Sequence, residues 1–566
     1  MLEYRLPATD ERVDALVLGQ RAGAAALTAV VVELKQWTNA APLPTDRLSV
    51  KVSGRIVLHP ARQVGGYVHY LDHWVPDSIK LLTRGVVVLH NASPEVVANL
   101  RHVVAGGASS QYQILGRNDL DAGTPARVLA ERLGCDDLGP APDSLIEQFL
   151  KVQHRPLPKL LSRVADAIDG DGDGGFALIG DQDTARLEIL KAVSMARQGG
   201  PGHIVVVTGG PGTGKTAIAV RMFGELCRRA NANPRLLSPS GTLTRQLTRA
   251  IGDAARGLIT TFTDSLPAGL SKDSIILLDE AHRVRTFPDR HPGRPTILEH
   301  LIRRCGVTVL FLDERQIVRP TEGVTLEELR GLAASNDLTF AHIDLTTQFR
   351  CSGSQRYLRW IDTLFTEHGA PPSWQGQDYD LGLADNPRQL EDWMTSQIQL
   401  GHGARITAGF CWPWDSPSKP PLWPEVSIDW TDEQGTQRWQ RAWNSRVNQA
   451  IGDEADIPGR PFWATDVGGD QQVGCVYTAQ GMEYDYGGVI IGDDLIRTSS
   501  GWQGLPAKSH DSALRDLPPE RYLSYVLNVY RVLATRGTRG TRLYSTDPAT
   551  QRYLRDLFPD PGGNPG

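Results

Sequence analysis

The chain has 566 residues, which is too long for a single hydrophobic core and predicts roughly three or four domains. Its hydrophobic fraction of 40% and charged fraction of 22% are ordinary for a globular protein and exclude disordered and fibrous classes. The net charge of -6 does not favour nucleic-acid binding by the protein as a whole, so such a function would depend on local positive patches.

The cysteines and the N-terminus argue against several further classes. The six cysteines are scattered singly, without the spacing of a zinc or iron-sulfur site. The first residues do not have the pattern of a secretory signal, and no apolar run approaches the roughly 18 residues needed to cross a bilayer. We therefore expect a cytoplasmic protein that does not contact a membrane.

Two predicted strands near the N-terminus carry a group of charged residues. Arg12–Leu18 and Ala26–Trp37 read as a hairpin, which places Asp14, Glu33 and Lys35 near one end of a sheet. Glu33 and Lys35 share a face of their strand because side chains alternate. Two carboxylates can hold Mg²⁺ or Mn²⁺, and a neighbouring lysine can polarise a water for attack on phosphorus. The pattern indicates metal-dependent phosphodiester hydrolysis.

An amphipathic helix predicted over Leu58–Trp74 carries Gln63 toward these charged residues. The arrangement resembles the PD-(D/E)xK nuclease fold, with Asp14 at the aspartate position, Glu33 and Lys35 as the ExK pair, and Gln63 as the glutamine found on a helix in many members. The resemblance implies that Asp14 and Glu33 bind the metal while Lys35 and Gln63 assist catalysis. Such folds usually start with a helix before the aspartate strand, and only thirteen residues precede Asp14. Two alternatives stay open, a true start that lies upstream and a trimmed domain.

Residues 203–220 read as a buried strand, a glycine-rich loop and the start of a helix. The loop matches the Gly-x4-Gly-Lys-Thr pattern of phosphate-binding loops in the strand-loop-helix context that this pattern requires. Backbone N–H groups of such a loop wrap the phosphates of ATP, the lysine reaches the terminal phosphates, and the threonine hydroxyl can ligate Mg²⁺. The candidate ATP contacts are Gly209, Gly210, Pro211, Gly212, Thr213, Gly214, Lys215 and Thr216.

Polar residues at the ends of other strands complete a candidate ATPase site. A buried strand ends in Asp279 and Glu280, where Asp279 can hold Mg²⁺ and Glu280 can activate the attacking water. A second buried strand ends at Asp313 and is followed by Gln316, which can sense the γ-phosphate. Gln182, which precedes the loop, can pair with adenine because an amide both donates and accepts hydrogen bonds.

Three later segments follow in order: Arg350, Thr478–Glu483 and Arg536. Together with the phosphate-binding loop and the acidic strand end, this series resembles superfamily 1 helicases, and most closely the Schlafen group 3-like DNA/RNA helicase domain, over about residues 176–548. The resemblance implies that ATP binds between two RecA-like lobes. It also implies that Arg350 and Arg536 reach the phosphates from the second lobe when the lobes close.

The predicted fold class is α/β, with two RecA-like parallel-sheet lobes preceded by a small restriction-endonuclease-like α/β domain. A glycine- and aspartate-rich run at residues 169–175 lacks the distal glutamate of an EF-hand loop, which favours a linker. The expected parts are a nuclease-like domain at 1–142, a helical bridge and linker at 143–175, lobe 1 at 176–344, lobe 2 at 345–555, and a disordered tail at 556–566.

The expected function is an ATP-dependent nucleic-acid helicase or translocase fused to a metal-dependent nuclease. Two alternatives stay open: a nucleic-acid-stimulated ATPase whose N-terminal domain binds without cutting, and an NTP-dependent switch that responds to a protein partner. We expect nucleic acid as the partner, with DNA ahead of RNA. The candidate contacts are Thr242, Arg245, Thr261–Thr263, Thr478 and an arginine-rich run between Arg221 and Arg256.

Tryptophans are concentrated between Trp360 and Trp443, in the part of the chain where no motif is found. Such rings can stack on bases in a single-strand groove. We expect most of them to anchor the core or loops instead.

Overall fold

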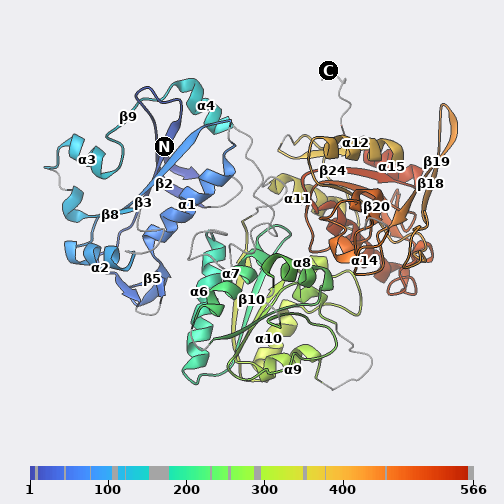
Figure 1. Ribbon diagram of the computed structural model, residues 1–566, viewed down its shortest axis with the longest axis horizontal. Helices are drawn as coiled ribbons and strands as arrows, with labels where there is room; N and C mark the ends of the chain where they lie inside the picture. Colours follow the sequence, from blue (N-terminus) through green and yellow to red (C-terminus); the bar gives the residue numbers. More distant parts are fainter. Residues whose placement is uncertain are drawn as a thin grey trace. The chain divides into compact units, whose positions relative to one another are not determined.

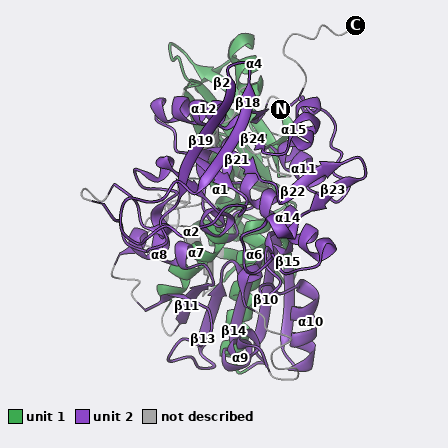
Figure 2. Cartoon of the chain, turned by 90° about the vertical axis from the view of Figure 1, so that its right-hand side faces the viewer, with its two compact units in different colours: residues 1–199, 216–230, 343–349 green, residues 200–215, 231–342, 350–566 purple. Residues whose placement is uncertain are grey.

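The structure is a computed structural model, and Figure 1 shows its elements. Two compact units divide the chain (Figure 2). Unit 1 comprises residues 1–199, 216–230 and 343–349, and unit 2 comprises residues 200–215, 231–342 and 350–566. Each unit is described by itself. The described residues are 1–6, 11–43, 46–76, 78–104, 112–120, 123–151, 178–229, 232–252, 257–285, 295–347, 354–376, 378–452 and 456–558.

The main sheet of unit 1 has the strand order β1-β2-β3-β7-β8, with β9 paired to β2. β1, β2 and β3 pair antiparallel, whereas β3, β7 and β8 pair in parallel. The predicted hairpin is therefore confirmed as β2 and β3. The strands are β1 (Leu2–Arg5), β2 (Arg12–Arg21), β3 (Leu27–Leu34), β7 (Leu81–Leu89), β8 (Gln113–Gly116) and β9 (Leu138–Gly139).

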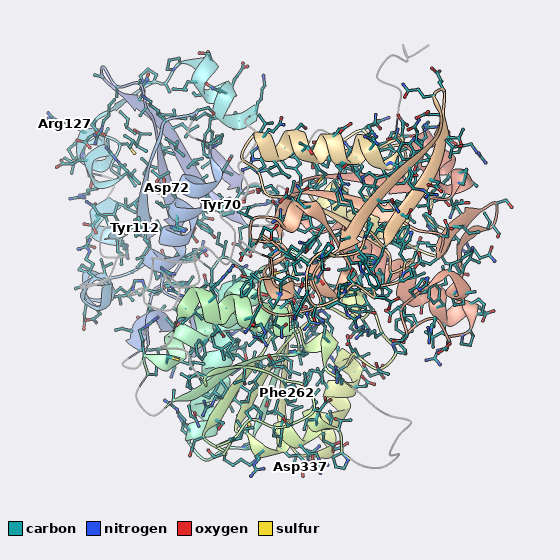
Figure 3. All side chains as sticks on the ribbon, turned by 45° about the vertical axis from the view of Figure 1, so that its right-hand side comes forward. Tyr70, Asp72, Tyr112, Arg127, Phe262 and Asp337 are labelled. Carbon is teal, nitrogen blue, oxygen red and sulfur yellow. The ribbon has the colours of Figure 1, made fainter. Side chains whose placement is uncertain are left out.

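Helix α1 (Pro60–Trp74) packs on this sheet and confirms the predicted amphipathic helix. Pro60 stands at its first turn, and the ring Nδ1 of His59 caps the helix by accepting from the Ala61 N–H at 3.2 Å. Its apolar face carries Tyr70, labelled in Figure 3, into the core with the inward residues of β3. The other elements here are α2 (Pro94–Val104), α3 (Ala126–Arg132), α4 (Asp143–Lys151) and a small sheet of β4 (Ala41–Leu43), β5 (Asp46–Val52) and β6 (Arg55–Leu58).

Two helices from the middle of the chain also belong to unit 1. They are α6 (Asp181–Arg197) and α7 (Lys215–Cys227), of which the first residue, Lys215, belongs to unit 2. The expected linker at residues 169–175 lies outside the described residues, as does the end of the chain from residue 559. The domain limits expected from the sequence therefore stay a prediction.

The first sheet of unit 2 has the strand order β12-β11-β13-β14-β10-β15. The pairs β10/β14, β13/β14, β11/β13 and β11/β12 are parallel. Parallel strands place their carboxyl ends at one edge, so the loops after β10, β13 and β14 meet there. The strands are β10 (His203–Gly209), β11 (Asn233–Ser238), β12 (Ile259–Thr261), β13 (Ser274–Leu278), β14 (Val307–Leu312) and β15 (Thr339–Leu345).

Buried β-branched and leucine side chains explain why these strands lie at the centre of their sheet. All residues of β13 and β14 are buried, which is the composition of strands covered on both faces. The helices of this part of unit 2 are α8 (Gly241–Ile251), α9 (Ile297–Arg304) and α10 (Leu326–Ser335).

The second sheet of unit 2 has the order β16-β24-β21-β17-β20-β19-β18 and is parallel except for the β18/β19 hairpin. Its strands are β16 (Asp380–Leu383), β17 (Ala404–Ala408), β18 (Val426–Asp432), β19 (Gly435–Trp443), β20 (Gln472–Gly474), β21 (Tyr484–Ile491) and β24 (Gly537–Ser545). The remaining elements are α11 (Gln355–Leu364), α12 (Pro387–Gln399), α13 (Val476–Ala479), β22 (Leu495–Thr498), β23 (Gly501–Gly504), α14 (Pro519–Ala534) and α15 (Pro548–Asp556).

The predicted α/β class with two parallel-sheet lobes is confirmed. Below, the part of unit 2 built on β10–β15 is called lobe 1, and the part built on β16–β24 is called lobe 2. Among the described helices, none is both long and apolar enough to cross a membrane.

Candidate functional site

The glycine-rich loop between β10 and α7 has the backbone that a phosphate cradle needs. Gly212 and Gly214 have φ angles of 84° and 88°, which are costly for residues with a Cβ. The Thr213 hydroxyl donates to the Gly210 carbonyl at 3.0 Å and closes the loop on itself. The predicted contacts from Gly209 to Thr216 thus form one continuous turn into the start of α7.

Lys215 lies at the centre of this loop. Its Nζ donates to the carbonyls of Gly209 and Gly210 at 2.6 and 2.8 Å and lies 3.9 Å from Oδ2 of Asp313. The same carboxylate oxygen accepts a 2.7 Å hydrogen bond from Nε2 of Gln316. The lysine of the loop and the predicted γ-phosphate sensor are therefore linked through Asp313.

The two carboxylates after β13 are buried, with Asp279 at 2% exposure and Glu280 at 8%. Oδ1 of Asp279 accepts from the Glu280 backbone N–H at 2.9 Å. Glu280 adopts a left-handed backbone with φ 55° and ψ 39°, which costs a non-glycine residue on the order of 1–3 kcal/mol. Such strain is typical of functional positions, where the surrounding structure holds a side chain in one place.

His282 is a site residue that the sequence reasoning missed. Its Nε2 lies 2.9 Å from Oε2 of Glu280. Burial raises the pKa of Glu280, but His282, Arg283 and Lys215 outweigh this effect and lower it below its ordinary value. Glu280 is therefore held as a carboxylate, the form that can accept a proton from water. The position of His282 directly after Asp279-Glu280-Ala281 is a signal that could have identified it.

Gln480 brings lobe 2 to this site. Its Nε2 donates to the Gln316 carbonyl at 2.9 Å and lies 3.2 Å from Nε2 of His282. A side chain at the next residue, Gly481, would place its Cβ 3.6 Å from Oε1 of Glu280. The segment predicted as 478–483 therefore lies beside Glu280, the predicted base, and is hydrogen-bonded to Gln316, the predicted phosphate sensor.

The structure places Arg536 and Gln182, two of the residues predicted to act on ATP, in different units. Arg536 is buried in lobe 2, where its Nε donates to the Val532 carbonyl at 3.0 Å. Arg350 lies outside the described residues. Gln182 lies in unit 1, in the first turn of α6, where its Oε1 accepts from the Ile179 N–H at 3.3 Å. The roles of all three stay predictions.

A basic pocket of about 280 Å³ lies at the junction of the two lobes of unit 2. Phe262, labelled in Figure 3, and Tyr477 line it with aromatic surface, and Trp414 adds an indole from lobe 2. Cations and one anion complete the lining. The polar and charged lining residues include Ser240, Thr242, Thr263, Thr478, Arg283, Arg285, Arg319, Arg460 and Glu322.

The predicted nucleic-acid contacts are partly gathered in this pocket, which Thr242, Thr263 and Thr478 all line. The arginine-rich run is divided between the two units, and Arg256 lies outside the described residues. Arg221 is buried in unit 1, and Arg249 forms an ion pair with Asp466 at 2.8 Å, so neither presents a free surface charge. Arg228 and Arg245 are exposed, so phosphate contact by other members of the run stays a prediction.

Most of the described tryptophans that were expected to be core anchors are so placed. Trp360, Trp374, Trp439 and Trp443 are buried. Trp393, Trp412 and Trp430 are partly buried against the core of lobe 2, whereas Trp423 is exposed. Trp414 differs, since it is half-buried at the pocket with its indole N–H donating to the Asn444 carbonyl at 3.1 Å.

In unit 1, the N-terminal charged residues come together at one end of the sheet. The β2/β3 register pairs Ala15 with Val32, so Asp14 and Glu33 face each other across the hairpin, and Oδ2 of Asp14 accepts from the Leu34 N–H at 2.7 Å. Nζ of Lys35 lies 2.6 Å from Oε1 of Glu33. The three charged residues predicted to act together are therefore neighbours.

Gln63 reaches the same end of the sheet through a chain of hydrogen bonds. Its Nε2 donates to the Tyr67 hydroxyl at 2.8 Å, and that hydroxyl donates to Oε2 of Glu11 at 3.1 Å. Burial raises the pKa of Glu33, Asp14 and Glu11 add to the increase, and Lys35 opposes it. Glu11 and Tyr67 are residues that the sequence reasoning missed, because no motif marks them.

The carboxylate site has features that suit a cation. Oε2 of Glu33 is buried and has no hydrogen-bond partner among the described residues, although Glu33 is only 3% exposed. Within the described part of the chain, no group of three His, Cys, Asp or Glu side chains could hold a metal ion by itself. Mg²⁺ usually keeps several waters, so one or two carboxylates suffice when substrate oxygens join them. Asp14 and Glu33, which face each other across the hairpin, fit that arrangement.

Comparison with known proteins places this site in context. A family model described as Schlafen group 3, DNA/RNA helicase domain, matches residues 202–547, more than half of the chain. The uncharacterized protein YPL245W of Saccharomyces cerevisiae is 22% identical over 405 residues, which cover 62% of this chain and 83% of that protein.

Solved structures with detectable similarity include two helicases. The Pif1 helicase from Candida albicans is 10% identical with a TM-score of 0.28, covering 67% of this chain and 98% of its own. The DUF1998 helicase MrfA bound to DNA is also 10% identical with a TM-score of 0.28, covering 71% of this chain and 53% of its own.

Proposed function

Since the chain belongs to the Schlafen group 3 DNA/RNA helicase family, we propose that it is an ATP-driven nucleic-acid helicase or translocase. One observation carries the proposal: the hydrogen bond from Gln480 of lobe 2 to the carbonyl of Gln316 in lobe 1. Gln316 is hydrogen-bonded to Asp313, and the same carboxylate lies 3.9 Å from Lys215. Loss of the terminal phosphate beside Lys215 would therefore be transmitted to lobe 2 through Asp313, Gln316 and Gln480. That connection is what converts hydrolysis into lobe movement.

The residues of the site divide the chemistry of hydrolysis among them. Lys215 would exchange its loop carbonyl partners for the terminal phosphates, and Thr216 and Asp279 would hold Mg²⁺, which neutralises charge on the phosphates. Glu280 would orient the attacking water and accept its proton, with His282 holding the carboxylate in place. Arg350 and Arg536 are proposed to add positive charge when the lobes close.

The basic pocket is the proposed nucleic-acid track. Arginines that contact phosphates and aromatic rings that stack on bases are the two components of single-strand binding. The pocket supplies arginines from both lobes, Arg283 from lobe 1 and Arg460 from lobe 2, together with the half-buried indole of Trp414. We propose nucleic acid as the partner, with DNA as the first candidate and RNA as the second.

ATP hydrolysis by the full chain tests this function when it is measured with single-stranded DNA, duplex DNA or RNA and without any polymer. We expect one polymer to stimulate hydrolysis strongly, because the track and the ATP site share Thr478–Gly481. Lys215→Ala is the blank and is expected to lose the stimulated rate. If no polymer changed the rate of ATP hydrolysis, the result would contradict the proposal and favour the NTP-dependent switch that responds to a protein partner.

Arg460→Ala is expected to weaken binding of the stimulating polymer while leaving polymer-independent hydrolysis unchanged. The loss of one phosphate contact should reduce the slope of log affinity against log salt by about 1. Arg438→Ala is a matched control, because Arg438 is exposed on the β18/β19 hairpin and already paired with Asp429 at 2.6 Å. If the slope of log affinity against log salt were unchanged in Arg460→Ala, Arg460 would not contact the nucleic acid.

For the N-terminal sheet we propose metal-dependent phosphodiester cleavage. Oε2 of Glu33 is buried beside Lys35 and has no hydrogen-bond partner in the part of the chain that the structure describes, which supports a site that binds a cation and activates a water. The second candidate is a domain that binds nucleic acid without cutting it. That candidate would be favoured if Glu33→Ala left every cleavage-dependent activity intact.

A further inference from the structure

A cluster of buried charges joins three helices of unit 1 and has no part in the chemistry described above. Its members are Arg62 on α1, Asp183 and Arg186 on α6, and Arg221 and Glu225 on α7. Arg62, Arg186 and Arg221 are 6%, 2% and 2% exposed, and Asp183 is 7% exposed. Charges are rarely buried unless they are paired, because each one loses its hydration. The cluster therefore constrains the three helices strongly.

Helices α6 and α7 are joined by the strongest pair of the cluster. Nε and Nη2 of Arg186 donate to the two carboxylate oxygens of Glu225, both at 2.8 Å. Arg229 donates to the same carboxylate at 2.7 Å. Burial raises the pKa of Glu225, but the arginines outweigh it and lower this pKa to about 2. Two-point contacts of this kind fix direction as well as distance.

Helix α1 enters the cluster through Arg62. Burial lowers the pKa of Arg62, and the carboxylates of Asp183 and Glu225 oppose that decrease. Burial raises the pKa of Asp183 to about 6, while Arg62, Arg186 and Arg221 act to lower it. Arg186 acts with burial to lower the pKa of Arg62. The chain just before α6 lies against α1, since a Cβ on Gly66 would lie 3.6 Å from the Leu178 carbonyl. The buried guanidinium of Arg62 therefore lies among charges that belong to α6 and α7.

The ends of these helices lie at the two candidate active sites. Helix α7 begins with Lys215 and Thr216 of the phosphate-binding loop. On α1, the residue after Arg62 is Gln63, whose amide is bonded through Tyr67 to Glu11 at the carboxylate site. Helix α6 also abuts that site, because a Cβ on its N-cap residue Gly180 would collide with Oε1 of Glu11.

We propose that the buried charge cluster couples the nucleotide state of the phosphate-binding loop to the N-terminal carboxylate site. The proposal rests on the function proposed above. When phosphates bind at the start of α7, a shift of that helix carries Arg221 and Glu225 with it. If α1 did not follow, Arg62 would be a buried charge separated from its carboxylates, which is energetically costly. Helix α1 therefore moves with α7 and repositions Gln63. Arg62 is thus a positioning residue and touches no substrate.

Hydrogen–deuterium exchange of the full chain, with and without a non-hydrolysable ATP analogue and Mg²⁺, tests the coupling without requiring cleavage. In the natural chain we expect the analogue to slow exchange both in the loop at residues 209–216 and in α1. In Arg62→Met, the loop should still be protected and the response of α1 should disappear. Lys191→Met, an exposed change on α6, should behave as the natural chain does. Asp183→Asn is a second variant that removes a charge with little change in shape.

The outcomes separate the coupling from the function on which it rests. A protected loop with no response of α1 in the natural chain would overturn the coupling and leave ATP binding intact. No protection anywhere would overturn both. If the chain cleaves nucleic acid, ATP should change its cleavage rate on the order of fivefold or more, and Arg62→Met should cleave at one rate with or without ATP. An ATP effect that survives in both Arg62→Met and Asp183→Asn would also overturn the coupling.

Discussion

Glu280→Gln should reduce the turnover number of ATP hydrolysis by about 10²- to 10⁴-fold, which is the usual contribution of a general base. The amide keeps the shape of the side chain but cannot accept the proton of the attacking water. Nucleotide binding should persist, since Lys215 and the loop are untouched. Single-turnover hydrolysis and equilibrium binding of a fluorescent ATP analogue measure the two effects separately.

Glu327→Gln provides the matched control for this change, because Glu327 is exposed in the first turn of α10. It should hydrolyse ATP at the natural rate. If Glu280→Gln retained full turnover, Glu280 would not be the base, and the buried carboxylate of Asp279 would become the next residue to test. If it lost binding as well, the left-handed turn at residue 280 would have a structural role in forming the loop.

Lys35→Ala should abolish cleavage of nucleic acid, with a loss of at least about 10²-fold if the lysine assists proton transfer. The removal also leaves the buried carboxylate of Glu33 without its 2.6 Å ion pair. ATP hydrolysis should be unaffected, because the residues proposed for it are those of the phosphate-binding loop and the strand ends. Cleavage is measured on labelled single and double strands with Mg²⁺ or Mn²⁺, and chelation of the metal should remove it.

Two comparisons make the cleavage experiment decisive. Lys51→Ala changes an exposed lysine of β5 and should cleave normally. Mn²⁺ should raise the melting temperature of the natural chain and not that of Glu33→Gln, which lacks one charge at the carboxylate pair. Cleavage that survives in Lys35→Ala would show that the assigned site is wrong.

The sequence alone predicted the residues whose roles depend on local backbone. A phosphate-binding loop needs glycines at positions of positive φ, and Gly212 and Gly214 occupy them as the motif requires. Strand ends that carry Asp279 and Asp313 could be recognised because buried parallel strands are nearly continuous apolar runs. Glu33 and Lys35 could be placed together because strand side chains alternate with a period of two.

Only the tertiary structure determined the contacts between segments that are distant in the chain. Gln480 meets Gln316 across 164 residues, and no local pattern encodes that meeting. Arg460 and Trp414 reach the basic pocket from a region without motifs, so only the folded chain could identify them. Within the arginine-rich run, composition could not show that packing buries Arg221 and pairs Arg249 with Asp466. Local chemistry follows from sequence spacing, but the environment of a charge depends on which elements pack around it.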